Sequence, residues 1–168
     1  MDAADMRKLS DALGTAIVNI DNYFSNFMKH GAAGGKGWAQ WAAESGRDPA
    51  KAAEMKKCLA LLSKMMKDGK AAQAGIKKLR KLADTKTMAK YPTGKDYRDL
   101  VVYKHLLPLD AWAKSAVQFK KTMNTFTGGL SPHPNFGNAR FMNEIVTYNS
   151  TVELLDYYIV LQKKLDQV

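Results

Sequence analysis

The sequence predicts an all-α fold, most simply an antiparallel four-helix bundle, and three observations support this prediction. Four segments carry apolar residues three and four positions apart, the spacing that places side chains on one face of a helix. No segment shows the alternation of a β-strand, and stretches rich in glycine or proline separate the four segments. With 168 residues, 46% of them hydrophobic, we expect one helical-bundle domain over residues 1–168 that buries its own core.

The first helix is expected over residues 5–30. Its apolar side chains predict one buried face, formed by Met6, Leu13, Ile17, Ile20, Phe24 and Phe27. We expect this helix to stop at Gly31, because several more glycines follow within a few residues and glycine destabilises a helix. An additional short helix is expected near residues 38–44, around Trp38 and Trp41.

The second helix is expected to begin at Asp48 and Pro49, since aspartate is a favoured N-cap and proline is tolerated at the first helical position. From there runs the longest regular stripe in the chain. Its members are Met55, Cys58, Leu62, Met65, Gly69, Ala72, Ile76, Leu79 and Ala83. Glycine costs about 1 kcal/mol relative to alanine inside a helix, so the segment is either one long helix or two helices hinged at Gly69. Cys58, the only cysteine, is expected to be a small buried hydrophobe.

A loop at residues 89–95 precedes a third helix, expected from about residue 96 to residue 126. Pro108 removes a backbone N–H inside it, so we expect a kink or a break just before that residue. Its core residues are Val102, Leu109, Trp112, Ala116, Phe119, Met123 and Phe126. A fourth helix is expected to follow Asn138 as N-cap. Its core residues are Phe141, Ile145, Tyr148, Val152, Leu155 and Ile159.

The net charge is concentrated in one part of the chain. The protein carries 26 Lys and Arg against 16 Asp and Glu, a formal charge of +10, and residues 51–95 hold 13 of the basic but only 3 of the acidic side chains. Eight lysines fall opposite the apolar stripe of the second helix: Lys56, Lys57, Lys64, Lys67, Lys70, Lys77, Lys78 and Lys81. They predict a helix face that attracts another protein with an acidic surface, or nucleic acid without sequence preference. The alternative is a solvated face that only keeps the bundle soluble.

The composition of this face bears on its target. Arg80 is the only arginine of the segment, and no aromatic residue lies between Trp41 and Tyr91. Base reading favours arginine, and single-strand binding favours aromatic side chains between the charges. We therefore expect electrostatic attraction without readout of a base sequence.

Arg98 and His105 lie seven positions apart, two turns along one side of an ideal helix. The pattern resembles the Arg-x4-6-His signature of HEPN ribonucleases, which are all-helical and dimerise to bring two such pairs together. The resemblance covers only residues 98–105. It implies metal-independent RNA cleavage, with His105 as general acid or base and Arg98 holding the phosphate. The alternative is a partly buried histidine, because His105 shares the core register of Val102 and Leu109.

Two loops hold further candidate binding residues. Trp38 and Trp41 are either an exposed interface anchor or a lid that closes one end of the bundle. His133 and Phe136 lie in a loop stiffened by two prolines, which either binds a partner or only connects two helices.

Other function classes are not expected. The three histidines lie far apart and no paired cysteines occur, so we expect no metal and no cofactor. No apolar run approaches the roughly 18 residues of a membrane span, and the charged start of the chain does not fit a secretory signal. We expect a cytoplasmic protein, with signal-free export as an effector left open.

The sequence therefore favours a non-enzymatic interaction protein of microbial or viral origin: an adaptor, an inhibitor or an assembly factor. The alternative is a nucleic-acid-directed protein, either a non-specific binder or an HEPN-like ribonuclease. The oligomeric state stays open.

Overall fold

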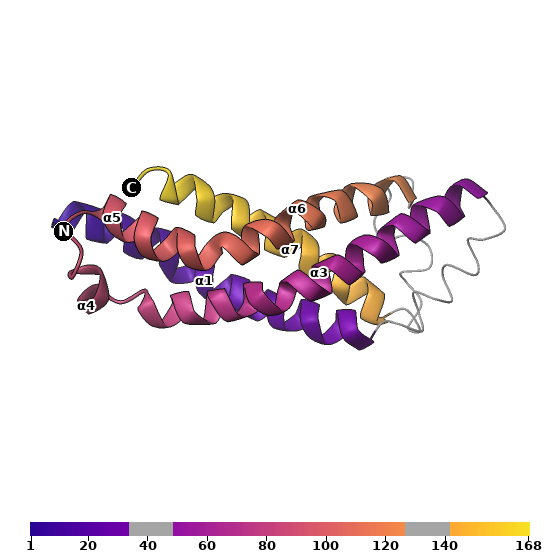
Figure 1. Ribbon diagram of the computed structural model, residues 1–168, viewed down its shortest axis with the longest axis horizontal. Helices are drawn as coiled ribbons and strands as arrows, with labels where there is room; N and C mark the ends of the chain where they lie inside the picture. The colour runs from indigo at the N-terminus through magenta and orange to yellow at the C-terminus, as the bar shows by residue number, and fades with distance from the viewer. Residues whose placement is uncertain (34–48, 127–141) are drawn as a thin grey trace.

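The computed structural model describes residues 1–33, 49–126 and 142–168 and is an all-α bundle (Figure 1). Its four long helices run antiparallel in chain order: α1 (Ala3–Ala33), α3 (Pro49–Leu82), α6 (Tyr103–Phe126) and α7 (Met142–Leu165). Between α3 and α6 lie the short helices α4 (Thr85–Met88) and α5 (Gly94–Tyr97) and a π-helical turn, η1 (Arg98–Val102). The all-α antiparallel bundle is thus confirmed. The short helix expected near residues 38–44 lies outside the described residues.

The helix α3 is continuous, which decides between the two alternatives for this segment. Every predicted stripe residue from Met55 to Leu79 is buried, and the helix passes Gly69 without a hinge. Gly69 lies close to α1, because a Cβ at this position would sit 2.7 Å from the Sδ of Met28. The missing side chain therefore serves helix packing, and the propensity cost of glycine is offset by contacts with α1.

The predicted end of the first helix at Gly31 is wrong, because α1 continues to Ala33. A Cβ on Gly31 would sit 2.6 Å from the Sδ of Met66 on α3 and 3.8 Å from a methyl group of Thr147 on α7. Gly31 is thus a packing position where three helices meet. Packing against neighbours overrides the weak helix propensity of glycine.

The predicted break before Pro108 is wrong, because α6 continues through this residue. The segment from Gly94 to Phe126 is helical throughout, with η1 as its irregular part. Helical turns of the π type are rare and occur mostly as single turns inside α-helices. Upstream, Thr93 and Asp96 form a capping box that starts the segment, and the Asp84 side chain caps α4.

The centre of the core is aromatic. Trp112 on α6 is fully buried, and its ring centroid lies 4.9 Å from that of Phe24 and 5.3 Å from that of Phe27, both on α1. Such pairs add about 0.5–1.5 kcal/mol beyond the area they bury. The predicted stripes of α1 and α6 thus meet across the bundle.

The predicted core stripe of the last helix is correct except at Ile159, and its first member, Phe141, lies outside the described residues. Tyr148 and Leu155 are buried and Ile145 and Val152 pack against the core, but Ile159 is 47% exposed. Thr147 and Thr151 are fully buried instead, on a face that also buries Glu144. The two threonine hydroxyls donate to backbone carbonyls one turn earlier, at 2.6 and 2.8 Å. A hydroxyl satisfied in this way can be buried at little cost, so the buried face of α7 does not look apolar in the sequence.

Gly75 marks the tightest approach between α3 and α6. A Cβ at this position would collide with the backbone carbonyl oxygen of His105. A backbone atom cannot move aside as a flexible methionine can, so this contact fixes both the spacing of the two helices and the rotation of α3.

We expect Gly75→Ala to destabilise the protein by about 1–3 kcal/mol, because the new methyl group meets backbone. Gly14→Ala is the matched control, since Gly14 lies inside α1 with open space around it. The control should gain about 0.4–1 kcal/mol from the reduced entropy of the unfolded chain. Urea unfolding followed by circular dichroism measures both changes. Equal stability of the two variants would contradict the close approach.

Candidate interaction surface

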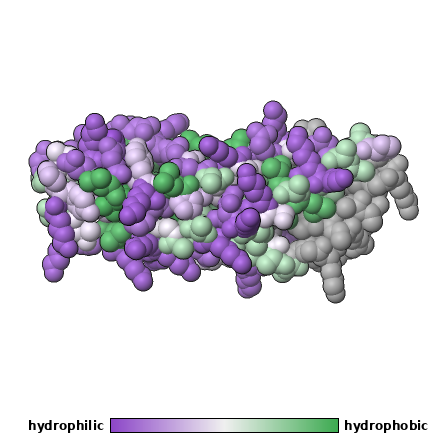
Figure 2. Space-filling view, viewed as in Figure 1, coloured by the Kyte–Doolittle hydropathy of each residue, from purple (hydrophilic) through white to green (hydrophobic). Residues whose placement is uncertain are grey.

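The eight predicted lysines are all exposed on α3, and we call them the lysine face: Lys56, Lys57, Lys64, Lys67, Lys70, Lys77, Lys78 and Lys81. The buried register of α3 faces α1 and α6 and so leaves the lysine face in solvent. From its first to its last lysine the face extends about 37 Å at the helical rise per residue. In Figure 2, hydrophilic residues cover much of the surface, and hydrophobic residues form separate patches.

The lysine face is not neutralised by its surroundings. Among the described residues, none of its eight ammonium groups lies within 4.0 Å of a carboxylate. Arg80 differs, because its guanidinium donates to the Asp21 carboxylate of α1 at 2.9 Å. The side chain of Asp21 is only 11% exposed, so Arg80 forms a partly buried ion pair between α3 and α1. The free positive charge on the outside of α3 is therefore carried by lysine.

The basic surface continues from α3 onto α6. His105 on α6 has a lowered pKa, first because it is partly buried and then because Lys78 and Lys104 are close enough to disfavour its cationic form. Lys104 is exposed and precedes this histidine. Positive charges on both helices thus disfavour protonation of the His105 imidazole, which is neutral at pH 7.

Arg98 and His105 do not converge. The Arg98 side chain is 14% exposed, and its Nη1 donates to the carbonyl oxygen of Leu165 at the end of α7 at 3.2 Å. Its Nε donates to Asp99 at 2.8 Å, and the guanidinium lies 5.4 Å from the ring centroid of Tyr103. His105 instead lies against α3, so the shared helix side expected from the spacing is not observed. The π-helical turn between the two residues shifts their register.

Cys58 is fully buried, and burial raises the pKa of its thiol to about 12, so the thiol stays protonated at neutral pH. In the part of the chain that the structure describes, no three His, Cys, Asp or Glu side chains are grouped as metal ligands. No helix in that part is long and apolar enough to cross a membrane. Trp38, Trp41, His133 and Phe136 lie outside the described residues.

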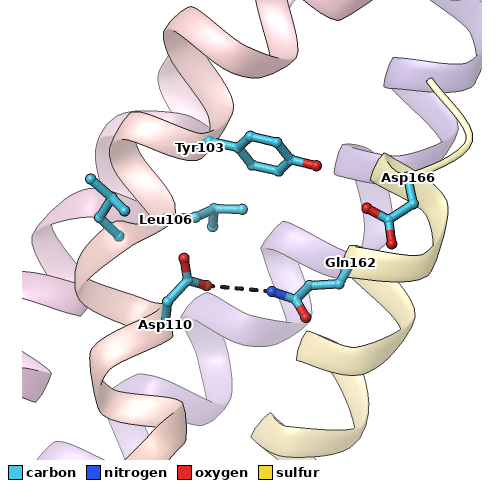
Figure 3. A pocket seen from close by; sticks show the side chains of 6 residues that line it. Tyr103, Leu106, Asp110, Gln162 and Asp166 are labelled. Carbon is cyan, nitrogen blue, oxygen red and sulfur yellow. Dashed lines mark hydrogen bonds between the residues drawn. The ribbon is translucent and has the colours of Figure 1, made fainter.

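A groove of about 350 Å³ between α6 and α7 was not anticipated from the sequence (Figure 3). Its lining comes from α6, from α7 and from the turn that follows α7: Tyr103, Leu106, Leu107, Asp110, Gln162 and Asp166. The two lining carboxylates give it the opposite sign to the lysine face, and no lysine or arginine lines it. The positions recur three and four apart on each helix, but only the antiparallel pairing of α6 with α7 brings them together.

Hydrogen bonds hold the polar side chains of this groove. Asp110 Oδ1 accepts from the Tyr158 hydroxyl at 2.5 Å and from Gln162 Nε2 at 3.5 Å, while Gln162 Nε2 also donates to the Tyr158 oxygen at 2.7 Å. The Tyr103 hydroxyl is directed toward Asp166 (Figure 3). Burial raises the pKa of both tyrosines, and the neighbouring carboxylates raise it further. Both phenols therefore remain donors at neutral pH.

We expect Lys78→Gln to raise the pKa of His105 toward the ordinary value of 6.5, because removing a neighbouring positive charge favours the imidazolium. Lys104→Gln should act in the same direction, and burial should keep the pKa below 6.5 in both variants. Lys64→Gln is the control, since Lys64 lies about four turns away along α3. A pH titration of the histidine ring protons by NMR measures these values. An identical His105 titration in all variants would refute a basic surface that spans α3 and α6.

We expect the Cys58 thiol of the native protein to react with a disulfide reagent only through unfolding of the chain. Burial removes access and suppresses the thiolate. The colour change of the reagent should be complete in denaturant and slow without it, and adding urea below the unfolding midpoint should accelerate it. Immediate reaction of the native protein would contradict the placement of this residue.

The chain matches no protein-family model, no curated protein and no solved structure. The lysine face and the groove between α6 and α7 are the two surfaces of the described residues that are suited to binding.

Proposed function

We propose that the protein is a non-enzymatic interaction protein, an adaptor, inhibitor or assembly factor, that binds an acidic surface of another protein through the lysine face. The observation that carries this proposal is the row of exposed lysines on one side of a continuous helix, without carboxylate partners among the described residues. A helix that is buried on one side from Met55 to Leu79 presents these charges in a fixed direction.

Electrostatics would act in two steps in this proposal. The summed field of the lysines increases the rate of encounter with an acidic partner. At contact, single lysine–carboxylate pairs on a surface contribute about 0–1 kcal/mol each, so affinity needs several pairs at once. At physiological salt the screening length is about 8 Å, and the partner must therefore lie directly against the face.

The chemistry of the face favours a protein over nucleic acid. Arg80 is occupied by Asp21, and no aromatic side chain lies among the eight lysines. The face thus has neither the guanidinium forks that read bases nor the rings on which single-stranded bases stack. Non-specific contact with phosphates is the outcome against which the proposal is tested.

The test is a charge reversal with a matched control. One variant changes Lys56, Lys67, Lys70 and Lys81 of the lysine face to glutamate, and the control changes four other exposed lysines, Lys8, Lys29, Lys114 and Lys163. Both variants lose the same net charge. We expect the first to bind polyglutamate at least about tenfold more weakly than the control, with its helical circular dichroism retained.

A second arm replaces polyglutamate with a duplex RNA over a range of salt concentrations. Tighter binding of the RNA, with an affinity that falls steeply on a log-log plot against salt, would favour the nucleic-acid alternative over the proposal. Equal losses in both charge-reversed variants would show that net charge, and not the lysine face, attracts the probe.

A further inference from the structure

The groove between α6 and α7 is a second surface with its own chemistry, separate from the lysine face on α3. Leu106 is almost fully buried and forms its apolar floor. Leu107 stands at its edge with 63% of its surface exposed, and Ile159, one turn before Gln162 on α7, is 47% exposed. Large aliphatic side chains are thus exposed on both helices that form the groove.

The groove holds two carboxylates, those of Asp110 and Asp166. Tyr158 and Gln162 both donate to one oxygen of Asp110, and the Tyr103 hydroxyl is directed toward Asp166. Since no cationic side chain lines the groove, the two negative charges are available to a cation from outside. Arg98 lies near Asp166 but is engaged by Asp99 and by the Leu165 carbonyl.

From this combination we propose that the groove binds an amphipathic, basic helix of a partner protein. Apolar side chains of that helix would lie over Leu106, Leu107 and Ile159, and its lysine or arginine side chains would pair with Asp110 and Asp166. Charge complementarity identifies this occupant, because an acidic or purely apolar helix would leave the two carboxylates unpaired on binding. Two antiparallel helices that receive a third along their groove are a common recognition mode.

The probe is a 14-residue peptide of leucine and lysine with leucines spaced for one helix face, labelled for fluorescence anisotropy. Its matched control has the same leucines and glutamate in place of lysine. The protein is the full chain, as wild type and as variants. We expect the double variant Asp110→Asn with Asp166→Asn to bind the lysine peptide about tenfold or more weakly than wild type does. Leu107→Ala should bind it about fivefold more weakly.

Matched variants separate the groove from general effects. Asp156→Asn removes an exposed carboxylate of α7 outside the groove lining, and Val18→Ala removes an exposed aliphatic group from α1. Both should bind the lysine peptide within about twofold of wild type. Binding of the glutamate peptide should not respond to the groove variants.

Three results would overturn the inference. The first is unchanged affinity of the double variant for the lysine peptide. The second is a loss of affinity for this peptide in Asp156→Asn as large as that in the double variant. The third is an equal loss of affinity for the glutamate peptide in the groove variants. The substitutions conserve shape or lie on the surface, and thermal unfolding of each variant verifies that binding is measured on folded protein. Reversal of charge on the lysine face does not enter this test, so the two proposals stand or fall separately.

Discussion

The architecture depends on the close approach of α3 to its two neighbours. At Gly69 it meets α1, and at Gly75 its backbone lies against the carbonyl of His105 on α6. Because the contact at Gly75 is with backbone, it restricts the rotation of α3 and so fixes the outer side of the helix as well. The direction in which the lysine face points is therefore set by contacts on the opposite side of the same helix.

Much of the fold could be predicted from the sequence wherever a helix buries apolar residues against other apolar residues. The stripes that include Phe24, Met65 and Trp112 are of this kind, and all three residues are buried. The last helix was harder, because Thr147 and Thr151 satisfy their hydroxyls within the helix and are buried despite being polar. Periodicity of hydrophobicity cannot detect a face of that composition.

Of the two candidate surfaces, the lysine face could be predicted from the sequence and the groove between α6 and α7 could not. The exposure of Lys67 and its seven companions follows from local periodicity, so the sequence was sufficient to place them on one helix face. The groove that joins Asp110 to Gln162 depends on the pairing of two helices whose order in space no local pattern specifies. The prediction that Arg98 and His105 share one side of a helix was wrong for a third reason. It assumed an ideal α-helix where the chain forms a π-helical turn.

The turn η1 also constrains the length of the chain. A π turn accommodates one residue more than an α turn, so Arg98–Val102 contains a surplus residue. Deleting one residue there would restore an uninterrupted α-helix and rotate the preceding turn by about 100° relative to α6. The Tyr97 hydroxyl would then leave the carbonyl oxygen of Leu82, to which it donates at 2.7 Å. Divergent versions of this bundle should therefore tolerate substitutions in the turn more readily than deletions.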